Sequence, residues 1–271
     1  MLIPERLKER LHLLGLNESI YGQRTRKCVL SKERLNMERA PWYPNAYIID
    51  DSFETNSLIF DPVSIVPCLA LDPKPNDRIL DMCAAPGTKT YIISFMTNNK
   101  ASITANDIDS RRILRLTANA KKYGIKCSIL NQSGRTLEGN FNKILIDAPC
   151  SGEGMVNKKD KLFRHWSERR IKFLSKKQKK LVNRGFDMLD GGGTLVYSTC
   201  TFAPEENEAV VDFLLKKHSG ELAGIDVPIT HVSGITSWNG KEFDERVRSC
   251  MRIYPNQNGT GGFFVAKIRK A

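Results

Sequence analysis

The 271-residue chain lacks the cysteine and histidine spacings from which proteins build zinc sites and disulfide frameworks. It has seven cysteines, an odd number, with no Cys-x-x-Cys motif, and only four histidines. Unpaired thiols of this kind are typical of a reducing compartment. We therefore predict no metal site and a cytoplasmic location, or a nuclear one if the source is a eukaryote.

The chain also lacks a long hydrophobic run. No stretch approaches the roughly 18 apolar residues that a membrane span needs. Charged residues stand near the N-terminus, where a signal peptide would have its apolar core. We expect no membrane partner and no secretion.

Acidic residues are few compared with basic ones. The chain has 30 Asp and Glu against 42 Lys and Arg, a formal net charge of +12. Such an excess favours a polyanionic partner, with nucleic acid ahead of an anionic membrane surface. Residues 158–184 alone hold twelve basic side chains and two acidic ones, although a solvated helix face would show the same pattern. Six of them are our candidate nucleic-acid contacts: Lys158, Lys159, Lys161, Arg164, Arg169 and Lys176.

Strand-like and helical patterns alternate from residue 78 onward, after a predicted helix over residues 1–20 and an irregular stretch over 21–76. The predicted strands are 78–83, 101–106, 126–131, 143–148 and 194–199, and the predicted helices are 88–98, 110–123, 167–189 and 205–218. We expect Ser110 and Ser167 to be helix N-caps, and Gly124 and the glycine run 191–193 to stop helices.

This alternation predicts an α/β fold with a mostly parallel, doubly wound, Rossmann-like sheet. Two further strand-like runs near the C-terminus predict an antiparallel edge hairpin. We divide the chain into a small N-terminal extension, residues 1–50, with potential RNA contacts, and a catalytic domain, residues 51–271.

Glycine is scarce where a dinucleotide-binding protein would need it. The loop Asp81-Met-Cys-Ala-Ala-Pro-Gly-Thr-Lys-Thr90 has one glycine and no G-x-G-x-x-G fingerprint, which argues against a nicotinamide-dependent oxidoreductase. The next strand ends at Asp107, from which a carboxylate can accept both ribose hydroxyls. Alone, Asp107 would be an ordinary carboxylate at a helix N-terminus. Together with the loop, it favours an adenosine-type cofactor without a pyrophosphate, S-adenosylmethionine first.

Two cysteines close strand-like runs. Cys150 follows Lys143-Ile-Leu-Ile-Asp-Ala-Pro, and Cys200 follows Thr194-Leu-Val-Tyr-Ser-Thr. Open α/β sheets place their chemistry at the carboxyl ends of parallel strands, where a thiolate can attack an electrophilic ring carbon. As catalysts we set aside four other cysteines, which we expect to be small buried side chains: Cys68, Cys83, Cys127 and Cys250.

Three motifs together resemble the RNA cytosine-5 methyltransferases of the Nop/Sun group. They are the loop Asp81–Thr90, Asp147-Ala-Pro-Cys-Ser-Gly-Glu-Gly154 and Tyr197-Ser-Thr-Cys-Thr-Phe-Ala-Pro-Glu-Glu-Asn-Glu208. The resemblance runs from about Pro41 to the C-terminus, and the combination of the two cysteine motifs is highly specific. It implies a class I methyltransferase fold, S-adenosylmethionine as the cofactor and RNA as the substrate.

The resemblance also implies roles for single residues in cofactor binding. The loop Cys83–Lys89 would line the methionine end of the cofactor, Asp107 would hold the ribose, and Asp147 would lie near the sulfonium and the target base. The implied cofactor residues are Cys83, Ala84, Ala85, Pro86, Gly87, Thr88, Lys89, Asp107, Ser133 and Asp147. The chain departs from the family pattern at several positions, including Thr88 for a second glycine and Ser133 for an acidic residue that usually contacts the adenine. Such departures bear on binding details rather than on the reaction class.

For the reaction, the resemblance implies Cys200 as the nucleophile, Cys150 as the group that assists product release, and Asp147 as the contact to ring nitrogen 3. The reverse assignment of the two cysteines, as in DNA cytosine methyltransferases, ranks below it. An aqueous thiol has a pKa of about 8.5, so a cation beside Cys200 would favour attack; Lys89 and Lys267 are the candidates.

We therefore predict methyl transfer to carbon 5 of cytosine in RNA, with tRNA favoured and rRNA as the alternative. The target base has to leave its stack to reach a pocket. A catalytically silent RNA-binding or ribosome-assembly factor is the alternative from another class, against which both cysteines argue. The sequence does not fix the oligomeric state, and a monomer is our expectation.

Overall fold

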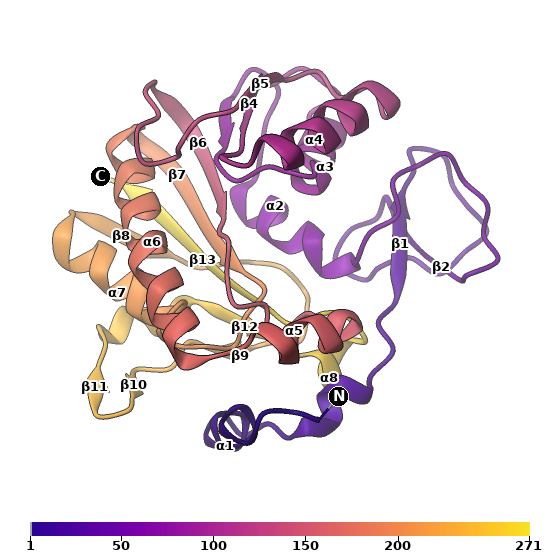
Figure 1. Ribbon diagram of the computed structural model, residues 1–271. Helices are drawn as coiled ribbons and strands as arrows, with labels where there is room; N and C mark the ends of the chain where they lie inside the picture. The colour runs from indigo at the N-terminus through magenta and orange to yellow at the C-terminus, as the bar shows by residue number, and fades with distance from the viewer. Residues whose placement is uncertain (1) are drawn as a thin grey trace.

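A computed structural model describes residues 2–271, apart from the side chain of Lys161. Five parallel strands form one part of its main sheet: β3 (Arg78–Asp81), β4 (Ser102–Asn106), β5 (Ser128–Leu130), β6 (Phe141–Asp147) and β7 (Leu189–Thr199). Four more complete it: β8 (Gly220–Ala223), β9 (Val232–Ser233), β12 (Met251–Ile253) and β13 (Phe263–Lys270). The order is β5-β4-β3-β6-β7-β13-β12-β9, with β8 also paired to β13 (Figure 1).

The last strand runs against its neighbours. β13 pairs antiparallel with β7 on one side and with β12 and β8 on the other. The predicted mostly parallel sheet with an antiparallel C-terminal hairpin is therefore confirmed, although β9 and not the hairpin forms the outermost edge.

Helices cover both faces of this sheet because its central strands are apolar on both sides. They are α2 (Val66–Leu71), α3 (Thr88–Met96), α4 (Ser110–Lys122), α6 (Glu168–Asp187) and α7 (Glu208–Lys217). In β6, Leu145 packs into the core that includes α2 and α3, whereas Ile144 and Ile146 pack into the core that includes α6 and α7. This alternation follows the two-residue period of a strand.

The predicted helix and strand centres agree with the structure, and the differences concern their ends. Ser167 caps α6 as expected, but Asp109 and not Ser110 caps α4, since its carboxylate accepts hydrogen bonds from the N–H groups of Arg111 and Arg112. The glycine run 191–193 lies inside β7, and α6 ends before it, at Asp187. Gly124 has a φ of 63°, the left-handed conformation that ends α4.

The stretch expected to be irregular contains regular elements. These are the antiparallel pair β1 (Lys27–Leu30) and β2 (Ala46–Ile49), the 3-10 helix η2 (Pro62–Ile65) and α2. The strands are only four residues long and are separated by a polar loop, so periodicity could not reveal them.

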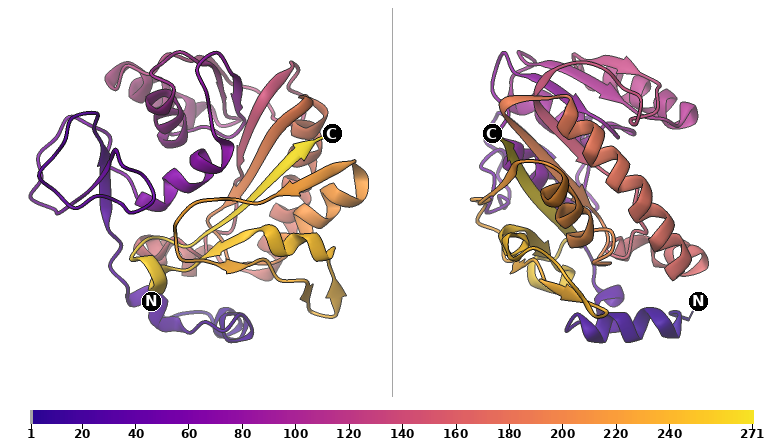
Figure 2. Two further views of the ribbon diagram at one scale, coloured as in Figure 1. Left: turned by 180° about the vertical axis from the view of Figure 1, so that it is seen from behind. Right: turned by 90° about the vertical axis from the view of Figure 1, so that its left-hand side faces the viewer.

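The N-terminal segment packs against the rest of the chain rather than folding alone. It holds α1 (Glu5–Leu13) and the 3-10 helix η1 (Glu18–Gly22), and Leu7, Leu11 and Ile20 share one core with Val156 and Phe163. Figure 2 shows this indigo segment at the lower edge of the molecule in both views. The boundary at residue 50 stays a prediction.

Short elements complete the chain. They are η3 (Val156–Lys158), α5 (Lys159–His165), the hairpin strands β10 (Ser237–Trp238) and β11 (Lys241–Glu242), η4 (Glu245–Ser249) and α8 (Pro255–Asn258). Among the described residues, no helix combines the length and apolar character needed to cross a membrane.

Candidate active site

The two cysteines singled out in the sequence meet at the carboxyl ends of neighbouring strands. β6 and β7 pair in parallel up to Asp147 and Ser198, and each strand continues into a loop that carries a cysteine. The Sγ atoms of Cys150 and Cys200 lie 3.2 Å apart. Because parallel neighbours end at the same edge of a sheet, two motifs 50 residues apart form one site.

Direct contacts join the two cysteine loops to each other. The N–H of Gly154 donates to the carbonyl of Cys200 at 2.9 Å. The buried carboxylate of Glu153 accepts hydrogen bonds from the hydroxyl of Thr201 and the N–H of Phe202, both at 3.1 Å. Gly154 also packs on Gly262, where a Cβ would lie 2.4 Å from the Gly262 carbonyl oxygen. Only glycine fits between these backbones.

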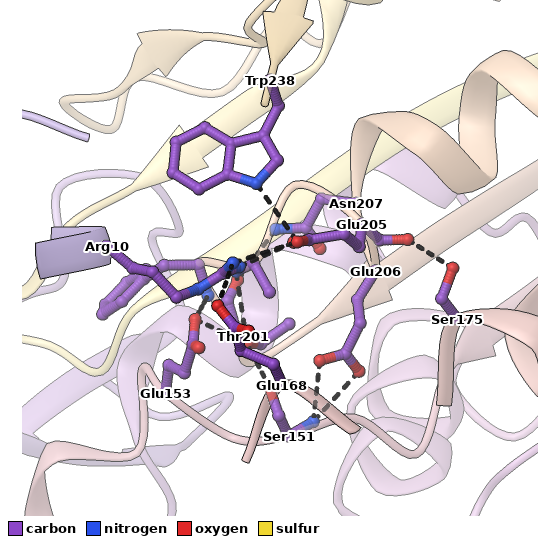
Figure 3. Close-up of polar contacts among 12 residues, drawn as sticks. Arg10, Ser151, Glu153, Glu168, Ser175, Thr201, Glu205, Glu206, Asn207 and Trp238 are labelled. Carbon is purple, nitrogen blue, oxygen red and sulfur yellow. Dashed lines mark hydrogen bonds and ion pairs between the residues drawn. The ribbon is translucent and has the colours of Figure 1, made fainter. Parts of the chain in front are cut away.

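The segment after Cys200 holds both loops in place (Figure 3). Glu206 accepts hydrogen bonds from the N–H of Ser151 at 3.1 Å and from Nε2 of Gln178 at 2.8 Å. Asn207 accepts from the hydroxyl of Thr199 at 2.6 Å and donates to the carbonyl of Thr201 at 2.9 Å. One glutamate thus supports the Cys150 loop, and the next residue supports the Cys200 loop.

Gln178 is a supporting residue that the sequence did not single out. Its Nε2 also donates to the carbonyl of Pro149 at 2.9 Å, so it ties α6 to the residue before Cys150. A single glutamine in a lysine-rich helix gives no signal by itself. By contrast, Glu153 and Glu206 belong to the two cysteine motifs, and this position in the sequence could have identified them as supporting residues.

A partly buried ion pair lies in the site of the cysteines. Nζ of Lys89 is 2.7 Å from Oδ2 of Asp147 and 5.0 Å from the ring centroid of Phe263. Ser198 donates its hydroxyl hydrogen to Oδ1 of Asp147 at 3.0 Å. Lys89 therefore lies in the same site as Cys200, as expected. Lys267 pairs with Val196, three positions before Thr199, and lies near Asp72 and Arg269, so its candidacy as the neighbouring cation was wrong.

Cys200, Asp147 and Lys89 line one cavity of about 390 Å³. Pro86 and Thr88 of the predicted cofactor loop line it too, together with Thr25, Asp61 and Gly262 from distant parts of the chain. A cavity of this size accommodates a small planar ring. The cavity brings the thiol of Cys200, a carboxylate and a cation together in one open pocket.

A second cavity, of about 220 Å³, lies on the other side of the loop and contains Cys83, Asp107 and Ser133. Its walls include the apolar side chains of Ile108, Leu174 and Leu181. One oxygen of Asp107 accepts from the N–H of Ala85 at 3.2 Å and lies 3.0 Å from Nη1 of Arg112, while the other accepts from the N–H of Asp109 at 3.0 Å. Since a carboxylate offers about four acceptor positions, the second oxygen keeps capacity for a ribose hydroxyl.

The cofactor loop fits an adenosine-type ligand. Ala84 and Ala85 are buried in it, and Gly87 has a φ of 108°, with Leu116 only 2.8 Å from where a Cβ would be. The apolar walls of the second cavity suit an adenine, and the carboxylate of Asp107 at its edge suits a ribose. The close-packed turn of small residues suits the methionine chain. The predicted cofactor residues thus divide between two cavities and the loop that contains Ala84, Ala85 and Gly87, and their ligand contacts stay a prediction.

A family model described as 16S rRNA methyltransferase RsmB/F matches residues 68–269. The chain belongs to this family. The tRNA (cytosine(49)-C(5))-methyltransferase of Pyrococcus abyssi is 37% identical over 256 residues, 89% of this chain and 82% of that protein. The 28S rRNA (cytosine-C(5))-methyltransferase of Mus musculus is 36% identical over 215 residues, 76% of this chain but only 27% of that protein.

Solved structures agree with this placement. A methyltransferase homologue from Pyrococcus horikoshii has a TM-score of 0.82 at 28% identity, covering 99% of this chain and 100% of that one. NSun6 from the same organism, solved with SFG, has a TM-score of 0.69 at 31% identity, covering 88% of this chain and 56% of that one. The predicted family, reaction class and Rossmann-like fold are confirmed, and S-adenosylmethionine dependence is a property of the family.

The pKa of Cys150 is raised well above its usual value. Its contact with the Cys200 sulfur is the largest cause, and burial is the second. A raised pKa favours the protonated form of Cys150, whose S–H can hydrogen-bond the neighbouring sulfur.

The predicted RNA contacts do not form a single surface. Lys158 lines the cavity of Cys200 and a smaller one beside Cys150, whereas Nζ of Lys159 donates to the carbonyl of Tyr21 at 3.0 Å. Arg164 and Arg169 are exposed. Lys161 belongs to α5, and its side chain lies outside the described part of the chain. Lys176 lies at a separate cavity on α6, and the RNA-binding role of all six stays a prediction.

The buried carboxylate of Glu206 should make the stability of the protein depend on pH. Burial raises its pKa from 4.5 to about 7, against the hydrogen bonds from Ser151 and Gln178. Because the folded state then binds the proton more tightly, stability from this group is fully present below pH 4.5 and is lost as the pH rises to about 7. In the wild type, this group should lower the free energy of unfolding by at most about 3 kcal/mol over that pH range. We expect the decrease to be absent from Glu206→Gln.

Urea unfolding between pH 4.5 and 8 measures this effect. Glu221→Gln, which removes an exposed carboxylate, is the matched control and should keep the wild-type profile. Asp81, whose pKa burial also raises to about 7, should leave a residual slope in both variants. A Glu206→Gln profile as steep as the wild-type one would contradict the assignment.

Proposed function

We propose that this chain transfers a methyl group from S-adenosylmethionine to carbon 5 of a cytosine in RNA, with tRNA ahead of rRNA as the substrate. The observation that carries the proposal is the 3.2 Å contact between the Cys150 and Cys200 sulfurs beside a cavity that contains Lys89 and Asp147. The carbon at position 5 of cytosine becomes nucleophilic only after a group adds to carbon 6, and a thiolate is suited to that addition.

Each residue of the site then has a distinct task. Cys200 forms the bond to carbon 6, and Asp147, held by Lys89 and Ser198, contacts ring nitrogen 3. The bound cofactor supplies the methyl group. Afterwards the carbon-5 proton passes to a base and the bond between Cys200 and carbon 6 breaks. The S–H of Cys150 can then hydrogen-bond the departing thiolate, because the two sulfurs are already in contact.

The preference for tRNA follows from how much of each relative the chain matches. It covers 82% of the Pyrococcus abyssi tRNA enzyme but 27% of the mouse rRNA enzyme and 43% of the Vibrio vulnificus small-subunit enzyme. A monomer in the cytoplasm stays a prediction.

Methylation of purified RNA tests the proposal. The protein is incubated with S-adenosylmethionine and either unmodified tRNA or protein-free rRNA, and 5-methylcytosine is mapped by bisulfite sequencing. We expect new 5-methylcytosine at one or a few positions of tRNA. Methylation of rRNA alone would overturn the preference for tRNA. RNA binding without methylation of either RNA would favour the catalytically silent factor.

Asp107 gives a separate test of the cofactor site. We expect Asp107→Asn to weaken the binding of S-adenosylmethionine about ten- to a hundredfold, since a hydrogen bond to a charged group contributes about 1.5–3 kcal/mol. Isothermal titration calorimetry without RNA measures the dissociation constant. Asp226→Asn, at an exposed position, is the control. An unchanged dissociation constant in Asp107→Asn would place the ribose elsewhere.

A further inference from the structure

A third cavity, of about 480 Å³, lies between α6 and the β10–β11 hairpin, away from the cysteines. Two aromatic side chains, Trp238 and Phe243, contribute to its wall. Four lysines surround it: Lys172, Lys176, Lys179 and Lys241. We call it the lysine cavity.

The lysines of α6 form one stripe on the helix. Lys172, Lys176 and Lys179 are spaced by four and three residues, which puts them on the same face. Lys241 approaches from the hairpin, so the positive charges come from two sides of the cavity. Within the described residues, Lys172, Lys176 and Lys241 have no ion pair with a carboxylate.

The carboxylate that lines the lysine cavity, Glu205, is already engaged (Figure 3). Arg10 of α1 holds both of its oxygens, at 3.0 and 2.7 Å, and Nε1 of Trp238 donates to it at 3.2 Å. The guanidinium of Arg10 also lies 5.2 Å from the ring centroid of Trp238. Glu205 is thus paired with a cation from outside the cavity, and it forms no ion pair with Lys172, Lys176 or Lys241.

The lysines of the cavity lie close enough to influence one another. Burial lowers the pKa of Lys179, and the charges of Lys241 and Lys216 lower it further, against the opposing pull of Asp212. Like charges that face one cavity repel one another, and a bound anion would reduce that repulsion. A phosphate group with several lysines around it gains charge-assisted hydrogen bonds.

Contacts through α6 and the loop after Cys200 connect the lysine cavity to the catalytic centre. The hydroxyl of Ser175 donates to the carbonyl of Glu205 at 2.5 Å, and the next residue, Glu206, holds the Cys150 loop. On another side of α6, Leu174, Lys177 and Leu181 line the cofactor cavity. One helix, about 10–12 Å across with its side chains, therefore separates the lysine cavity from the reaction.

We propose that the lysine cavity binds a phosphate of the substrate RNA, at a nucleotide other than the methylated cytosine. This inference rests on the proposed function, because it takes RNA to be the substrate. The cavity anchors the strand while the target base leaves its stack, and the contact is to the backbone, so it contributes affinity rather than sequence choice.

The test compares two double variants that lose the same charge. Lys172→Gln with Lys241→Gln alters the lysine cavity, and Lys100→Gln with Lys121→Gln alters two exposed lysines at the β4 and α4 end of the sheet. Fluorescence anisotropy with labelled tRNA measures the dissociation constant at several salt concentrations. Methylation of a short oligonucleotide that carries only the target cytosine is measured in parallel.

We expect the cavity variant to bind tRNA at least tenfold more weakly, with a salt slope smaller by about 0.7–0.9, the value for one phosphate contact. The control variant should change the dissociation constant less than threefold, and both variants should methylate the short oligonucleotide as the wild type does. Equal losses in the two variants would overturn the inference, and so would no loss in the cavity variant. A wild-type protein that binds no RNA would instead overturn the proposed function.

Discussion

Cys150→Ala is expected to accumulate a covalent complex between protein and RNA. The first step needs only the Cys200 thiolate, whereas release needs the thiol that lies 3.2 Å from the leaving sulfur. Without Cys150, the bond between Cys200 and carbon 6 should form and persist. A shifted band on a denaturing gel, sensitive to ribonuclease, measures the complex, and product formation should fall on the order of a thousandfold.

Cys200→Ala should show neither the complex nor methylation, because no other described thiol lies as close to the cavity of Lys89 and Asp147. Cys127→Ala is the matched control, since Cys127 is half-buried in the packing around β5 and distant in the chain from both loops. It should form product without a trapped complex. A complex that survives in Cys200→Ala would reverse the order of the two cysteines.

The largest loss of stability is expected from Arg252→Leu. Arg252 and Glu208 are 1% and 0% exposed, and their two hydrogen bonds measure 2.5 and 2.6 Å. Nη1 of Arg252 also donates to the carbonyl of Phe202 at 3.0 Å, two residues after Cys200. Removing the arginine leaves a carboxylate buried without its cation, which costs about 3–5 kcal/mol. Urea unfolding at neutral pH measures the change in free energy.

A second variant separates the missing charge from the missing volume. Arg252→Leu combined with Glu208→Leu removes both charges. Replacing both members of a buried ion pair by apolar residues often changes the stability little. We expect the double variant to recover more than half of the stability that the single one loses. If the two variants were equally unstable, packing and not the uncompensated charge would account for the loss.

The sequence predicted the elements whose pattern is local. The apolar runs of β3, β6 and β7 and the caps and stops of the long helices are written in neighbouring residues, so the sheet and the place of both cysteines followed from them. The 3.2 Å sulfur contact follows from the parallel pairing of β6 and β7, an order of strands that the sequence pattern did not specify. The cap of α4 was placed one residue late because Asp109 and Ser110 are both good caps.

Contacts between distant segments were not predictable in this way. Arg10 meets Glu205 across 195 residues, and Gln178 reaches Pro149 from a helix whose pattern showed only a basic face. Lys267 was a candidate neighbour of Cys200, yet the register of β13 places it opposite Val196, four residues before Cys200. Register is set by packing over the whole sheet, and a single sequence does not display it.

The contact between Gly154 and Gly262 links the reaction centre to the order of synthesis. The N–H of Gly262 donates to the carbonyl of Gly154 at 2.9 Å, and β13, which begins at Phe263, lies between β7 and β12 in the sheet. On a ribosome, the strands that carry both cysteines emerge well before this last strand. Residues 262–270 are thus made after both cysteines, and they complete the packing against the loop that follows Cys150.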